Sequence, residues 1–156
     1  MNLRTRLSRS NGYRELGMYG ESILILEDIP FEKERWHPLV VEARYNTYRD
    51  AKEWTLAMTM AEGMVNRMPD KFEWLKNQVD AMTECGDPTG ALQLLHDSSN
   101  RFGEDAKYIF ALGRQYALLC DIEGSKKYVK RAIKMDSSLK AEFLDDPAFD
   151  AVWDSF

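Results

Sequence analysis

Small residues recur along this chain at a fixed spacing. Ala57, Ala91 and Ser125 stand 34 residues apart, each just inside an apolar stretch. A period of this length is typical of stacked copies of one supersecondary unit. Chance does not readily explain it, because four further columns keep the spacing: Tyr48, Met82 and Tyr116; Val41, Leu75 and Ile109; Ala61, Leu95 and Val129; and the helix-breaking or capping set Pro69, Gly103 and Ser137.

Each period contains two stretches in which apolar residues recur with helical spacing. We predict helices over 34–49, 51–67, 71–84, 88–100, 106–119 and 122–135. Pro69 ends the second helix because proline has no N–H to donate and biases Met68 away from the α conformation. Gly86 suits the left-handed conformation that follows a helix, and Asp87 suits the cap of the next helix.

These columns make the chain similar to the tetratricopeptide repeat (TPR) family, bacterial type. Three units, 38–71, 72–105 and 106–137, match the pattern in phase. A degenerate unit over 3–36 precedes them, since Tyr13 stands 35 residues before Tyr48. We expect its first helix over 2–14, a turn over 15–22, a loose link over Pro30–Lys33, and core positions at Leu24, Leu26 and Ile29.

The tail, residues 138–156, breaks the phase and predicts two short capping helices, the second beginning at Asp146-Pro147 and including Phe149, Val152 and Trp153. Repeat arrays need an atypical unit to cover the apolar face of the last repeat. The tail also resembles the segment that follows the last repeat in many bacterial TPR proteins. We therefore expect a single domain over 1–156, all-α, folded as a right-handed α-α superhelix of antiparallel helix pairs.

Gly113 lies inside a predicted helix, where glycine costs about 1 kcal/mol relative to alanine. A close contact with a neighbouring helix explains its presence best. The same residue stands at the eighth position of its unit, where the TPR pattern places a small side chain.

The resemblance implies a concave groove lined by the first helix of each pair, a surface that commonly receives a peptide. The family's groove positions fall here on Leu39, Glu42, Asn46, Arg49, Asp50, Glu73, Lys76, Asn77, Asp80, Glu84, Lys107, Phe110 and Arg114. Some TPR domains clamp a C-terminal carboxylate with cations and asparagines at such positions. This chain matches that set at Asn46, Asn77 and Lys107 but has Glu42 and Ala111 at the other two positions, and Glu42 would repel the ligand carboxylate.

Catalytic and metal sites have little support in the sequence. His37 and His96 are 59 residues apart, and no nucleophile, zinc-protease or phosphate-loop motif occurs. The two cysteines, Cys85 and Cys120, lack metal-ligand spacing and are predicted to be small buried thiols. We expect a protein that is not an enzyme, with no cofactor and no metal.

Composition and charge limit the partners. The chain has 156 residues, 44% of them hydrophobic and 30% charged, which suits one soluble domain. Its net charge of −5 argues against a nucleic-acid partner. Neither a secretory leader nor a membrane span is evident, so we expect a cytoplasmic protein. The basic cluster Arg4, Arg6, Arg9 and Arg14 is interpreted as a solvated helix face.

Large apolar side chains have a packing explanation. The second helix carries an apolar stripe of Leu56, Met60, Met64 and Met68. Met58, Met60, Met64 and Met68 are explained as fillers between stacked helices, and Trp54 and Trp74 are expected in the core or between repeats. Trp36, near the loose link, is the aromatic residue whose burial the pattern supports least. An exposed apolar patch there would indicate a second contact surface.

The sequence favours a protein- or peptide-binding scaffold that uses the concave groove, in a bacterial cytoplasm. An alternative is a structural module that forms homo-oligomers through its ends or the Trp36 side. A chaperone for one client protein is a further alternative that rests on analogy. The partner itself cannot be named from these residues.

Overall fold

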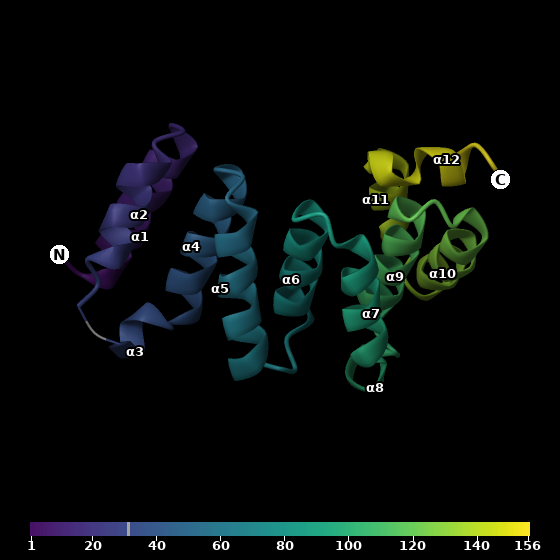
Figure 1. Cartoon of the computed structure of the whole chain (residues 1–156), viewed down its shortest axis with the longest axis horizontal. Coiled ribbons are helices and arrows are strands. Elements are labelled where there is room, and N and C mark those ends of the chain that lie inside the picture. Colours follow the sequence, from purple (N-terminus) through teal and green to yellow (C-terminus); the bar gives the residue numbers. More distant parts are fainter. Residues whose placement is uncertain (31) are drawn as a thin grey trace. The chain divides into compact units, whose positions relative to one another are not determined.

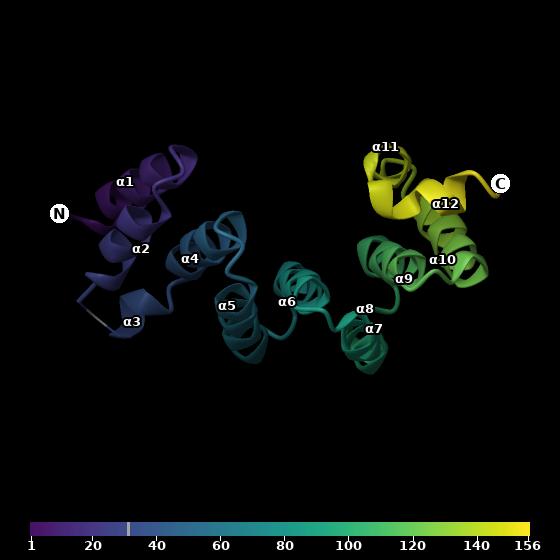
Figure 2. The same cartoon turned by 45° about the horizontal axis from the view of Figure 1, so that its top comes forward.

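The computed structural model describes the whole chain except residue 31 and the side chains of residues 32 and 33. The predicted link Pro30–Lys33 therefore lies largely outside the described residues. Every regular element elsewhere is helical, which confirms the all-α prediction. The chain divides into two compact units, Met1–Ala81 and Met82–Phe156, and the division falls within one helix. Figures 1 and 2 label the helices of both units.

The described part of the first unit contains two helix pairs, one short helix and most of a further helix. Their bounds are α1 (Leu3–Glu15), α2 (Tyr19–Glu27), α3 (Glu32–Arg35), α4 (Pro38–Asp50), α5 (Trp54–Arg67) and the part of α6 (Phe72–Glu84) up to Ala81. The second unit continues with α7 (Pro88–Asp97), α8 (Ser99–Phe102), α9 (Ala106–Leu118), α10 (Ile122–Met135), α11 (Leu139–Asp145), the 3-10 turn η1 (Pro147–Phe149) and α12 (Asp150–Trp153).

Three predicted helix boundaries need correction. The helix expected over 34–49 begins only at Pro38, because His37 is extended and its Nδ1 accepts a hydrogen bond from the Leu39 N–H at 3.3 Å. The next helix begins at Trp54 because Lys52, at φ 59°, forms a turn after α4. The helix expected over 88–100 is divided at Ser98 into α7 and α8.

The core of the first unit contains the small residues of the 34-residue columns. Ala57 and Ala61 on α5 are fully buried with Tyr45, Met64 and Trp74. A second cluster of Leu26, Ile29 and Val40 packs α2 against α4. One expected core position, Leu24, is wrong, since its side chain is 65% exposed. Leu56 of the apolar stripe is also 44% exposed.

In the second unit, α9 and α10 approach closely at Gly113. A Cβ added there would lie 2.7 Å from Val129 Cγ2 and 3.1 Å from the Val129 backbone nitrogen, so a larger side chain does not fit. This contact confirms the explanation of Gly113. Helix α7 is fixed to α9 by the Tyr108 hydroxyl, which donates to the Leu95 carbonyl at 2.7 Å, and by the Gln115 amide, which donates to the Pro88 carbonyl at 2.9 Å.

The turns between paired helices repeat a left-handed conformation. Gly17, Lys52, Gly86 and Cys120 have positive φ values of 74°, 59°, 90° and 61°. Cys85 and Cys120 lie in such turns and are exposed, so the expectation of buried thiols is wrong. Both residues follow the last turn of a helix, where the chain reverses at the surface.

Candidate functional site

The predicted groove residues fall in both units, and each unit presents its own set. The first unit holds Glu42, Asn46 and Arg49 on α4 and Glu73, Lys76, Asn77 and Asp80 on α6, while the second holds Lys107, Phe110 and Arg114 on α9.

Helices α4 and α6 are in direct contact in the first unit through one side chain. The buried Tyr45 of α4 donates its hydroxyl hydrogen to the backbone carbonyl of Asn77 in α6 at 3.1 Å. Its ring also meets Trp74 edge-on, with 6.5 Å between centroids. Exposed and half-buried polar residues flank this contact on both helices. We name these polar residues of α4 and α6 the α4–α6 face.

The two helices present the same spacing of polar residues on this face. Glu42, Asn46 and Arg49 occupy positions i, i+4 and i+7 of α4, and Glu73, Asn77 and Asp80 occupy the same positions of α6. Residues at this spacing align along one side of a helix. Each helix therefore presents a carboxylate, an amide and a charged residue in the same order, and we name the three pairs by type: the carboxylate level, the amide level and the upper level, which has opposite charges.

The upper level is already paired. Arg49 binds Asp50 at 3.0 Å, Lys76 binds Asp80 at 2.9 Å, and Arg14 of α1 reaches Asp50 at 2.5 Å. Burial raises the pKa of Asp50, but hydrogen bonds and charge from Arg14 and Arg49 outweigh it and lower the pKa overall. Asp50 is thus held in its ionised form between two guanidinium groups.

The two lower levels are not paired. Glu42 and Glu73 are exposed, and neither carboxylate has an ion-pair partner among the described residues. Asn46 and Asn77 are half-buried, and within the described part of the chain their side-chain amides have no hydrogen-bond partner. These four groups remain available to a ligand.

Titration of Tyr45 provides a test of the α4–α6 contact. Burial raises its pKa to about 12, the nearby Asp80 carboxylate adds to the rise, and Arg49 opposes it. Since the phenol has a pKa near 10 when unfolded, its contribution to stability is complete below pH 10 and is lost as pH rises through about 12. We expect the wild-type protein to lose stability relative to Tyr45→Phe over this window, measured by urea unfolding. A difference between the two proteins that stays constant from pH 9 to 12 would contradict the assigned environment.

Two of the three groove positions of the second unit, Phe110 and Arg114, contact the chain's own tail. Phe110 is only 4% exposed and packs against Phe149 of η1, with 5.2 Å between ring centroids. The Arg114 Nε donates to the Asp146 carboxylate at 2.5 Å. Phe110 is therefore a core residue here, in contrast to the exposed groove position that we expected, while Lys107 is exposed. In the sequence, Asp146 and Phe149, which stand three residues apart in the tail, are the residues that could have indicated this contact.

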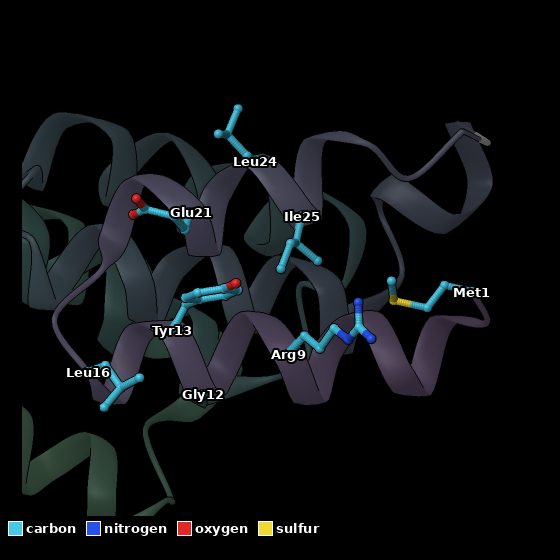
Figure 3. Close-up of a pocket in the computed structure, with 8 residues that line it drawn as sticks. All are labelled: Met1, Arg9, Gly12, Tyr13, Leu16, Glu21, Leu24 and Ile25. Atoms are coloured by element: carbon cyan, nitrogen blue, oxygen red, sulfur yellow. The ribbon is translucent and has the colours of Figure 1, made fainter.

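A cavity of about 580 Å³ lies along α1 and α2 in the first unit. Figure 3 shows Tyr13 and Ile25 directed into the space between the two helices and Leu24 directed away from α1. Leu16 and Leu24 are 75% and 65% exposed, so this edge of the unit is an open apolar surface.

Other residues singled out in the sequence have structural roles. Arg6 pairs with Asp28 at 2.9 Å, so two of the four clustered arginines are used in ion pairs. Trp36 is half-buried against the core, and the Arg67 guanidinium lies 3.5 Å from its ring centroid. His96 Nε2 is hydrogen-bonded to the Tyr116 hydroxyl at 3.0 Å. Among the described residues, no group of three potential metal ligands occurs and no helix could span a membrane.

No protein-family model matches the chain, and no curated protein gave a significant match. Several solved structures do match the chain. A thermophilic TPR protein of Thermus thermophilus superposes over 96% of this chain and 85% of its own, with a TM-score of 0.66 and 17% identity. TPR-like repeats of a putative kinesin light chain from Podosopora anserina cover 87% of this chain and 75% of their own, with a TM-score of 0.61 and 13% identity. The fold is a TPR-like α-solenoid.

MamA of AMB-1 gives a further match, with a TM-score of 0.52 and 13% identity over 85% of this chain and 91% of its own. These likenesses establish the TPR fold. In such a fold, neighbouring helical repeats stack on one another. Glu42, for which the resemblance implies a position where a carboxylate clamp has a cation, is exposed and has no ion-pair partner among the described residues.

Proposed function

We propose that this chain is a protein-binding scaffold and that its α4–α6 face binds an extended segment of a partner protein. The observation that supports this proposal best is the register of Glu42 with Asn46 and of Glu73 with Asn77 on neighbouring helices. All four side chains lack partners among the described residues.

The amide level suits a peptide backbone. Each asparagine side chain offers two N–H donors and one carbonyl acceptor, which matches the alternating donors and acceptors of an extended chain. Water can reach these half-buried amides in the free protein, so a bound backbone would replace that water with direct hydrogen bonds. Asn46 and Asn77 therefore provide affinity that does not depend on the partner's sequence.

The carboxylate level provides selectivity. Glu42 and Glu73 attract a lysine or arginine side chain and repel a carboxylate. The paired upper level, with Asp50 and Asp80 already neutralised, adds little to that preference. We infer that the bound segment has a lysine or arginine whose side chain lies beside the carboxylates of Glu42 and Glu73.

A matched pair of variants tests this proposal. The change Glu42→Ala with Asn46→Ala removes one side of the face, whereas Glu62→Ala with Asn66→Ala removes the same residue types at the same spacing from the exposed surface of α5. We expect a partner recovered by affinity purification to bind the first variant at least about tenfold more weakly, because a charged and a polar contact are both lost. It should bind the second variant as it binds wild type. Equal binding to both variants, measured by calorimetry, would refute the assignment of this face.

Self-association is a second candidate function, favoured by the exposed Leu16 and Leu24 beside the α1–α2 cavity. Exposed apolar patches often mark contacts between proteins. We expect wild-type protein to dimerise with increasing concentration in sedimentation velocity and Leu24→Glu to remain monomeric. A wild-type protein that is monomeric at every concentration would exclude this function.

A further inference from the structure

A second cavity lies in the second unit, among α10, α11 and α12. Its volume is about 340 Å³, close to the lower end of the range for ligand pockets. Its apolar lining consists of Val129, Ile133, Phe143, Trp153 and Phe156. We call it the aromatic cavity.

The walls of the aromatic cavity are held in place by one buried ring. Phe143 is 4% exposed and meets Trp153 at 5.7 Å and Phe156 at 5.9 Å between centroids, edge-on in both cases. Trp153 and Phe156 are nevertheless 51% and 57% exposed. Large aromatic side chains held in position but left half-exposed are typical of a binding surface.

Three lysines surround the opening. Lys130 and Lys134 lie one turn apart on α10, and Lys140 extends from α11. None of the three has a carboxylate within ion-pair distance in the described part of the chain. In contrast, Lys126, one turn before Lys130, donates a hydrogen bond to the Ser155 backbone carbonyl at 2.7 Å and forms an ion pair with Glu123 at 3.5 Å.

The positive charge is local to this surface. Helix α10 contains five basic residues and one acidic residue, in a chain whose net charge is −5. The acidic residues of α11 and α12 do not line the cavity. The rim therefore attracts an anionic ligand even though the chain as a whole repels one.

We propose that the aromatic cavity binds an acidic peptide segment of a partner protein, with one aromatic or large aliphatic side chain inserted and carboxylates on both sides of it. The distribution of charge selects a peptide over a fatty acid or another amphiphile with one charged head. Lys130 and Lys134 are about 6 Å apart along the helix axis, given the rise of 1.5 Å per residue, and Lys140 comes from a different element. Three lysines spread over a turn of α10 and a second helix suit several carboxylates on both sides of an anchor better than a single one.

This site is independent of the α4–α6 face, which prefers a basic segment and lies in the other unit. The two sites therefore predict opposite charge preferences. If the proposal for one site fails its test, the proposal for the other site can still be tested.

The test uses a fluorescently labelled peptide, Asp-Glu-Phe-Glu-Asp, with the purified full-length protein. We expect saturable binding by fluorescence anisotropy that weakens as salt is raised, because the rim charges are exposed. Lys130→Glu with Lys134→Glu should weaken binding at least about tenfold. Lys127→Glu with Arg131→Glu, an equal charge reversal on the same helix at positions that do not line the cavity, should change it less than about twofold.

Two further ligands and one further variant complete the test. A peptide with alanine in place of phenylalanine should bind at least about tenfold more weakly, since burial of the ring is lost. A lauric acid probe should not displace the labelled peptide. Lys130→Gln with Lys134→Gln, which removes charge without introducing any, should also weaken binding, so misfolding of the glutamate variant would not decide the result. Equal loss in both charge-reversed variants, equal binding of a Lys-Arg-Phe-Arg-Lys peptide, or no binding would overturn the proposal.

Discussion

Replacement of Gly113 by valine is expected to destabilise the second unit by about 2–3 kcal/mol. The added side chain would meet the Val129 side chain at 2.7 Å and its backbone nitrogen at 3.1 Å. The side chain of Val129 can rotate, but its backbone belongs to α10 and can move only with that helix. Separation of α9 from α10 would disturb the largest helix contact of this unit. Urea unfolding followed by circular dichroism measures the change.

Gly12 provides the matched control, because it also lies within a helix, α1, but a Cβ there meets nothing within 4 Å. Gly12→Ala is expected to stabilise the first unit by up to about 1 kcal/mol through helix propensity alone. If Gly113→Ala and Gly12→Ala had the same effect, close packing would not be the reason for glycine at position 113.

Replacement of Phe149 by alanine is expected to cost about 3–5 kcal/mol, the range for a buried phenylalanine. Phe149 is 1% exposed and lies between Phe110 and Phe143, at 5.2 Å and 5.0 Å between centroids. Its loss leaves a cavity under η1 and weakens the contact that holds Asp146 beside Arg114. We therefore expect increased hydrogen exchange at the α9 amides as well as a lower melting temperature.

Phe156→Ala is the control for this change, because Phe156 is in the same tail but 57% exposed. Its truncation should cost less than about 1 kcal/mol. Equal destabilisation by the two changes would show that the tail does not pack on α9 through Phe149.

The sequence was sufficient to predict features that depend on neighbouring positions in the period. The small residues at Ala57 and Ala61 and the close contact at Gly113 were all predicted, since a repeat brings the same positions together in each unit. The helix pairs were also predicted, with boundary errors where His37 acts as a cap and Lys52 forms a turn.

The sequence predicted that the tail caps the last repeat, but it did not predict which side chains the tail covers. The burial of Phe110 requires knowledge of where the tail folds back, and no period relates residue 149 to residue 110. The exposure of Leu24 and Leu56 depends on which side of each helix has a neighbour. In the candidate site, the shared spacing of Glu42 and Asn46 with Glu73 and Asn77 was visible in the sequence, but their lack of partners was not.

The repeated left-handed turn has a consequence for engineering the chain. Only two of its four occurrences are glycine; Lys52 and Cys120 adopt the same conformation at a cost that side chains with a Cβ incur, of order 1 kcal/mol each. Lys52 and Cys120 therefore have strained backbone conformations, and they stand one repeat before and one repeat after Gly86. Glycine substitutions at Lys52 and Cys120 are expected to relieve that strain, and neither residue belongs to either proposed binding surface.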